Sequence, residues 1–162
     1  MAQNERAAEG LRIRRIGAQD RAEWGRLWTA YLEFYGTTLP PEVHDTTFAL
    51  LLTSAAERGA GDGPHGLIAE AEGQPVGLVH YIFHAHCWRP EGVCYLQDLF
   101  TTPEARGRGV ARALIMAVYD AADAAGRPAV YWLTQAQNRQ ARVLYDQVAQ
   151  ATDFIKYARA LA

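Results

Sequence analysis

Lysine is nearly absent from this 162-residue chain, because Lys156 is the only lysine among 16 basic residues. We attribute the excess of arginine to genome composition, so the number of arginines does not indicate phosphate binding. With 18 acidic residues the formal net charge is -2, which gives no general reason to expect a nucleic-acid partner. A local acidic pocket for a cationic substrate stays open.

The chain also has few cysteines and no long apolar run. Cys87 and Cys94 do not make a disulfide framework in a chain of this size, and we expect free thiols in a cytoplasmic protein. No apolar stretch is long enough to cross a membrane, and residues 1–10 lack the apolar centre of a signal peptide. We expect a flexible tail at 1–10 and a single domain over 11–162, with no membrane partner.

Hydrophobic periodicity predicts strands and helices in the order β-α-α-β-β-β-α-β-α-β. The first helix has an apolar stripe, which indicates a helix that packs against the core. The expected strands are 11–16, 67–71, 75–84, 93–100, 129–133 and 153–159; the expected helices are 20–35, 42–55, 110–125 and 138–150; the expected loops include 59–66 and 85–92. This order predicts an α/β fold with a mixed, largely antiparallel sheet and helices on both faces.

Residues 93–118 form the stretch around which the chain is organised. An apolar run ends at Thr101-Thr102-Pro103, and a glycine-arginine loop, residues 106–109, leads directly into a helix. Strand, glycine loop and helix N-terminus aim unpaired N–H groups at one point, which favours an anion. An ordinary strand-to-helix turn is the alternative. The P-loop and the dinucleotide fingerprint are excluded, because the loop ends Gly-Val-Ala and position 112 is arginine.

Three histidines, His80, His84 and His86, share one face of an expected strand. Imidazoles can bind zinc, but residues 80 to 86 span roughly 20 Å at about 3.3 Å per residue, too far for one ion without a bend. We therefore expect no metal. His80 lies nearest the middle of this strand.

The loop sequence Arg106-x-x-Gly109-x-Ala111 resembles the Q/R-x-x-G-x-G/A signature of the GNAT superfamily of N-acetyltransferases. Downstream, the chain repeats that family's N-x-x-A-x-x-L-Y pattern at Asn138, Ala141, Leu144 and Tyr145. The resemblance extends over residues 11–159. The segments HYIFH, YLQDLF, VYWLT and ARVLYDQVA are most similar to the branch of fungal histone and polyamine acetyltransferases and their bacterial relatives.

The resemblance implies transfer of an acetyl group from acetyl-CoA to a primary amine in a ternary complex, on a GNAT fold with splayed central strands. The amine can be a small amine, a polyamine, an amino acid or a protein amine. In this family the coenzyme binds between the splayed strands and over the glycine loop. The residues that correspond here are Leu99, Phe100, Thr101, Arg106, Gly107, Arg108, Gly109, Val110, Ala111, Arg112, Asn138, Ala141 and Tyr145.

Tyr145 can protonate the leaving thiolate or serve only as a buried anchor of its helix. The general base is not identified by the sequence, because Gln97 stands where relatives often carry glutamate, and Asp98 points to the opposite face unless a bulge intervenes. The group that takes the proton of the amine can be water, Glu33, Asp98 or His80.

Gln97, His80 and Tyr35 are the residues expected to contact the acceptor. A non-catalytic acyl-CoA-binding or sensing domain is the alternative function. The resemblance also implies that the last strand can take part in a homodimer.

Overall fold

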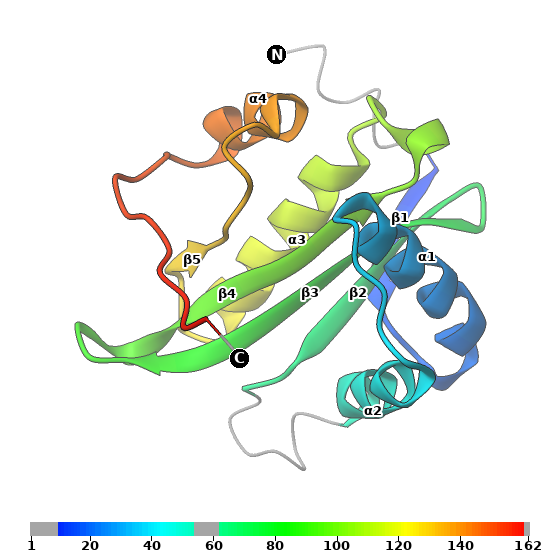
Figure 1. The fold of residues 1–162 in the computed structure, drawn as a ribbon, viewed down its shortest axis with the longest axis horizontal. Helices are drawn as coiled ribbons and strands as arrows, with labels where there is room; N and C mark the ends of the chain where they lie inside the picture. Colours follow the sequence, from blue (N-terminus) through cyan, green and yellow to red (C-terminus); the bar gives the residue numbers. More distant parts are fainter. Residues whose placement is uncertain (1–9, 54–61, 161–162) are drawn as a thin grey trace.

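The computed structural model describes residues 10–53 and 62–160, and five strands in them form one sheet in the order β1-β2-β3-β4-β5 (Figure 1). The main elements are β1 (Leu11–Arg15), α1 (Arg21–Phe34), α2 (Pro41–Leu52), β2 (His65–Ala71), β3 (Gln74–His86), β4 (Arg89–Thr101), α3 (Val110–Ala124), β5 (Val130–Tyr131) and α4 (Arg139–Val148). Strands β1 to β4 pair antiparallel, and β5 pairs parallel to β4. The predicted α/β fold with a mixed sheet is confirmed.

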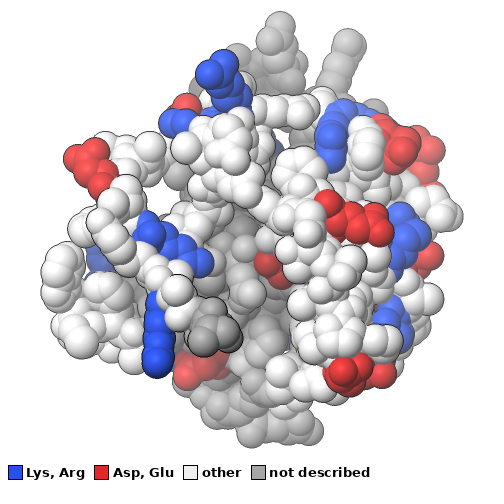
Figure 2. Space-filling view, viewed as in Figure 1, with Lys and Arg blue, Asp and Glu red and all other residues white. Residues whose placement is uncertain are grey.

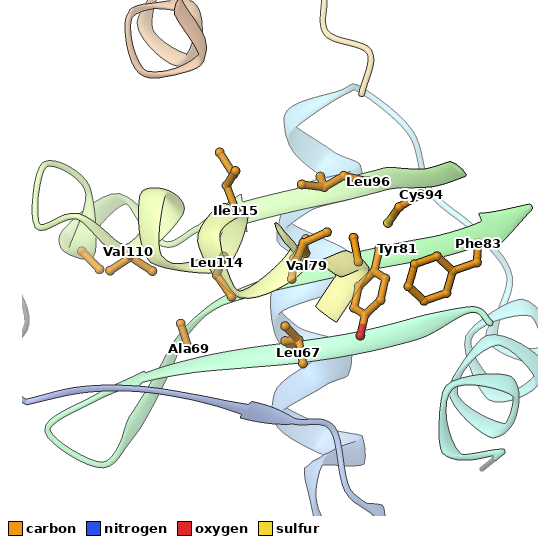
Figure 3. Packing of buried hydrophobic residues seen from close by; sticks show 13 residues of the cluster. Leu67, Ala69, Val79, Tyr81, Phe83, Cys94, Leu96, Val110, Leu114 and Ile115 are labelled. Carbon is orange, nitrogen blue, oxygen red and sulfur yellow. The ribbon is translucent and has the colours of Figure 1, made fainter. Parts of the chain in front are cut away.

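Side chains of the sheet alternate between two cores, one on each face. Leu67 and Ala69 of β2 pack toward α3, and Figure 3 shows them on the same side as Leu114. Ile68, between them, packs toward α1 and α2. Because each face buries apolar side chains, helices cover both sides of the sheet, as predicted.

The apolar stripe of α1 forms much of the second core. Trp24 and Leu27 are fully buried, and the Trp24 ring lies 5.0 Å from the Trp28 ring and 5.1 Å from the Phe48 ring of α2. The stripe continues to Tyr31, which is partly buried and packs against the edge of this core. Helix α1 therefore packs against the core along most of its length and carries aromatic side chains at its C-terminal end.

The predicted loop at 85–92 is wrong. Strand β3 continues to His86 and β4 begins at Arg89, with an irregularity in the pairing between His84 and His86. Gly92 has φ +86°, a backbone conformation that L side chains rarely adopt. These ends of β3 and β4 could not be predicted from side-chain periodicity, because their polar and apolar residues do not alternate. Backbone hydrogen bonds hold the two strands together independently of the side chains.

The predicted last strand at 153–159 is also wrong in this structure. Residues 149–160 form no strand, and Phe154, Ile155 and Tyr157 are exposed. A strand also needs a sheet edge long enough to pair with it, and the edge strand β5 has only two residues. Residues 1–9 of the expected tail, Ala55 and residues 59–61 of the expected 59–66 loop lie outside the described residues, and the end of that loop is wrong because β2 already begins at His65. No helix among the described residues is long and apolar enough to cross a membrane.

Candidate active site

A cavity of about 530 Å³ lies where the ends of β4, α1 and α4 meet the N-terminus of α3. It brings together most of the predicted site residues, although they come from three separate parts of the chain. Those lining it are Tyr35, Leu99, Phe100, Thr101, Arg106, Gly107, Gly109, Val110, Ala111, Arg112, Asn138, Ala141 and Tyr145. Of the predicted set, Arg108, Gln97, Asp98, His80 and Glu33 are not among the lining residues.

The glycine loop at one end of the cavity has the backbone of an anion site. Gly107 has φ +75° and Gly109 φ +81°, and Gly109 is the N-cap of α3 with no side-chain cap. A Cβ on Gly107 would meet nothing within 4 Å, so the backbone here borders open space. The first N–H groups of α3 have no partner within the helix, and the helix dipole adds partial positive charge. This end suits a phosphate group.

The edge of β4 is open next to this loop. Within the described residues, β5 pairs only with Cys94 and Tyr95, so the strands separate before Leu99. The buried Oγ1 atom of Thr101 has no hydrogen-bond partner among the described residues, and Thr101 lines the cavity. An extended polar chain such as pantetheine would give these groups partners, which makes coenzyme A a good fit.

Helix α4 presents Asn138, Ala141 and Tyr145 to the cavity, as their spacing predicts. Burial, together with the nearby Tyr35, raises the pKa of Tyr145 to about 12. The phenol therefore keeps its proton at neutral pH and can donate it. The Tyr145 ring also contacts Trp132 at 5.4 Å, so the residue anchors the helix as well.

A β-bulge at Gln97 decides where Asp98 points. His80 pairs with Asp98 and Tyr81 with Leu96, which leaves Gln97 without a partner in the ladder. As a result Leu96 packs in the α3 core while Asp98 turns toward α1. Without a bulge, Gln97 and Asp98 would point to opposite faces of a regular strand. No local residue pattern in the sequence indicates that a bulge is present.

Asp98 is held in a buried hydrogen-bond network. Its Oδ2 lies 2.8 Å from His80 Nδ1 and accepts the Trp28 indole N–H at 3.2 Å. The Trp24 indole N–H donates to His80 Nε2 at 2.9 Å, so His80 carries its proton on Nδ1 and donates it to Asp98. Burial alone would raise the pKa of Asp98, but the hydrogen bonds that it accepts, first of all from His80 and also from Tyr31 and Trp28, together outweigh burial and hold that pKa below its ordinary value.

The other residues proposed for the acceptor side are spread out. Gln97 and Glu33 are exposed, and neither lines the cavity. His80 is buried against Trp24 and Asp98, so it does not face the cavity directly. Of these proposed contacts, Tyr35 is the one that the structure brings to the cavity wall.

The three histidines have separate partners. His84 Nε2 accepts the Tyr131 hydroxyl at 2.9 Å, and His86 Nδ1 accepts the Trp88 backbone N–H at 3.2 Å. The described residues contain no group of three or more histidine, cysteine or acidic side chains that could hold a metal ion.

Several residues that line the cavity were not predicted from the sequence. They are Tyr31, Phe34, Ala105, Gln140, Val143, Leu144 and Gln147. Tyr31 belongs to the apolar stripe of α1, and its hydroxyl near the end of that stripe is the sequence signal that could have identified it. Phe34 lies off the stripe, and its 57% exposure in the structure is what identifies it.

We predict that Asp98→Asn lowers the free energy of unfolding by roughly 1–3 kcal/mol at neutral pH, because it weakens a buried charged hydrogen-bond network. Since folding lowers the pKa of Asp98, its stabilising contribution is present above the ordinary carboxyl pKa and is lost as pH falls. The difference between wild type and variant in urea unfolding should shrink below about pH 4. A difference that stays constant with pH would show that the charge is not its source.

Charged groups of both signs are scattered over the face of the molecule shown in Figure 2, and neither sign gathers into one continuous patch. The expectation that nucleic acid is not a partner stays a prediction. The two cysteines are free, with Cys87 exposed and Cys94 buried.

Residues 24–149 match the acetyltransferase (GNAT) family. A curated relative, the D-amino-acid N-acetyltransferase of Saccharomyces cerevisiae, is 39% identical over 148 residues, which cover 91% of this chain and 89% of the relative. An uncharacterized N-acetyltransferase of Bacillus subtilis is 29% identical over 91% of this chain and 95% of its own length. A solved aminoglycoside N-acetyltransferase in complex with a coenzyme A bisubstrate analogue shares the fold, with a TM-score of 0.78, 20% identity and coverage of 94% and 99%.

Proposed function

Because this chain belongs to the acetyltransferase (GNAT) family and is therefore an acetyl-CoA-dependent acyltransferase, we propose that it acetylates the amino group of a small α-amine. The observation that carries the proposal is the cavity itself, which is lined both by a helix N-terminus with its glycine loop and by tyrosines. One cavity can thus hold a phosphate-bearing donor and an amine side by side, which is the main requirement for direct transfer.

The residues that would hold acetyl-CoA are the loop and the open edge of β4. Gly107, Gly109 and the first N–H groups of α3 suit its pyrophosphate, and the backbone of 99–101 suits its pantetheine arm. Bound acetyl-CoA supplies the acetyl group in activated form, as a thioester. A backbone N–H at 99–101 can polarise the carbonyl. Tyr145 can give its proton to the sulfur as the bond to the acetyl group breaks.

No carboxylate in the described part of the chain lines the cavity, so none of them is placed to take the proton from the amine directly. Asp98 already accepts hydrogen bonds from His80 and Trp28, and neither Asp98 nor Glu33 lines the cavity. Gln97 cannot act as a base. We therefore assign the proton to water.

Under this water relay, Glu33→Gln and Asp98→Asn should each keep kcat within about tenfold of wild type, whereas loss of a general base costs roughly 10²–10⁴-fold. The rising limb of kcat/KM against pH should follow deprotonation of the free acceptor amine. Loss of turnover and of a basic limb near neutral pH in either variant would identify that residue as the base. A higher rate of Gln97→Glu at low pH would show that a glutamate there can serve.

The acceptor class follows from the yeast relative and from the missing glutamate. The relative's name states a D-amino-acid acceptor, and an α-amine has a pKa near ~7.7–8.0, far below the ~10.4 of an alkylamine such as lysine. A site without a placed base favours the amine that loses its proton more easily. D-amino acids are accordingly our first candidates.

A thiol-release assay with acetyl-CoA tests this proposal over D-amino acids, their L enantiomers, polyamines and aminoglycosides. We expect the highest kcat/KM with a D-amino acid. Faster turnover of a polyamine or an aminoglycoside would contradict the acceptor class. Binding of acetyl-CoA with no thiol release from any amine would instead favour a non-catalytic acyl-CoA-binding domain.

We also propose that the protein is a cytoplasmic homodimer whose C-terminal segments dock on the partner's β5 edge. Phe154, Ile155 and Tyr157 are exposed at 75–88%, and a second cavity of about 920 Å³ borders β5 and includes Tyr131 and Leu133. Exposed apolar side chains next to a short, open strand favour pairing with another chain.

Ile155→Asp should convert this dimer to a monomer in size-exclusion chromatography with light scattering. A charge would then replace an apolar side chain in the buried contact. Leu50→Asp is the control, because Leu50 is an exposed apolar residue on α2, away from the second cavity. A wild-type protein that is monomeric at high concentration would contradict the dimer.

A further inference from the structure

Aromatic side chains of two helices line a part of the cavity that we call its aromatic end. Tyr31, Phe34 and Tyr35 of α1 line it, and Tyr145 of α4 lines it as well. The Tyr35 ring lies 5.1 Å from the Tyr31 ring and 5.1 Å from the Phe34 ring, in edge-to-face arrangements. Aromatic faces carry negative electrostatic potential, so a group of rings around an open space attracts a cation.

Asp98 lies behind this group of rings, outside the cavity. The residue is only 7% exposed, and its charge adds to burial in raising the pKa of both Tyr31 and Tyr35. The carboxylate acts on the cavity through the tyrosines rather than by direct contact.

The charge of Asp98 has no cationic partner in the described part of the chain. Its hydrogen-bond donors include the uncharged Trp28 indole and His80, whose Nε2 accepts a hydrogen bond from Trp24 and which is therefore neutral. Arg106 and Arg112, the arginines that line the cavity, belong to the glycine-loop end, and Arg112 donates to Gln147. A buried carboxylate without a counter-charge favours a cation in the neighbouring space.

We propose that this aromatic end receives the acceptor amine as an ammonium ion, held over the Tyr31 and Tyr35 rings with Asp98 behind them. The proposal rests on the proposed function and names how that site selects its acceptor. The site favours a cationic head group over a neutral one of the same shape. The ammonium then loses its proton to water inside the site.

The probes are choline, which carries a permanent trimethylammonium group, and 3,3-dimethyl-1-butanol, its neutral carbon isostere. Both are titrated by calorimetry into the protein saturated with coenzyme A. We expect choline to bind at least about tenfold more tightly than the isostere, because cation–π attraction and the Asp98 charge act on choline alone. Equal binding of the two, or no binding of choline, would overturn the proposal without any need for a variant.

Variants then locate the site. Tyr35→Leu should weaken choline binding by roughly 3- to 30-fold, and the matched Tyr35→Phe should keep most of the affinity, because it retains the ring. Asp98→Asn should weaken choline binding and leave binding of the isostere unchanged. Choline affinity that is indifferent to both Tyr35→Leu and Asp98→Asn would place the cation elsewhere and refute the assignment.

The ammonium site and the proposed acetyltransferase function can be refuted independently of each other. Choline should inhibit thiol release competitively against the acceptor amine, and inhibition that is not competitive would refute the ammonium site while acetyl transfer stands. A protein that releases no thiol with any amine would refute the proposed function, and the calorimetry would still decide whether the aromatic end binds a cation.

Discussion

Gly109→Val is expected to weaken binding of acetyl-CoA by roughly 10- to 150-fold, the loss of one charge-assisted hydrogen bond or slightly more. Gly109 is the N-cap of α3 at φ +81° and lines the cavity. A branched side chain there occupies the space that a phosphate must approach and distorts the N–H groups that would bind it. Calorimetry with acetyl-CoA measures the change.

Gly126→Val is the matched control, since Gly126 follows the other end of the same helix at φ +68° and has open space around it. Both substitutions force valine into a left-handed conformation, so both should lower stability, by about 1–2 kcal/mol. Only Gly109→Val should lower affinity for acetyl-CoA. Unchanged affinity in folded Gly109→Val would refute the loop as the phosphate site.

Tyr145→Phe is expected to lower kcat by roughly 10²–10⁴-fold while the affinity for acetyl-CoA changes little. The substitution keeps the ring that contacts Trp132 and removes only the hydroxyl that can protonate the leaving sulfur. Because burial raises the pKa of Tyr145 to about 12, wild-type kcat should show no loss from tyrosine deprotonation below about that pH. Steady-state kinetics over pH measure both effects.

Tyr119→Phe is the control for this prediction. The Tyr119 hydroxyl donates to the Val148 carbonyl at 3.0 Å and so joins α3 to the end of α4, but Tyr119 does not line the cavity. Its loss should cost stability and leave kcat nearly unchanged. If Tyr145→Phe keeps kcat within twofold while chemistry limits the rate, Tyr145 serves only to anchor the helix.

The coenzyme end of the site could be predicted from the sequence because its signals are local. Gly107 and Gly109 at a strand-to-helix junction, and Asn138 and Tyr145 seven residues apart on one helix, need only backbone geometry to reach one place. The fold class followed from the order of periodic segments. Each of these inferences depends on residues close together in the chain.

The acceptor end depends on pairing between distant segments and could not be predicted in the same way. Asp98 faces α1 only because of the bulge at Gln97, and its burial depends on Trp28, seventy positions away in the chain. The failed prediction of a last strand at 153–159 has the same origin, since a strand exists only where an edge accepts it. Register and edge availability are properties of the whole sheet.

Transfer of a labelled acetyl group tests the central claim most directly. The protein is mixed with acetyl-CoA carrying an isotopically heavy acetyl group and with a D-amino acid, and the products are followed by mass spectrometry. We predict that the amino acid gains one heavy acetyl group for each coenzyme A released, and that Gly109→Val slows both together. Release of coenzyme A without acetylated amino acid, or no release with any amine, would contradict the assignment as an N-acetyltransferase of small α-amines.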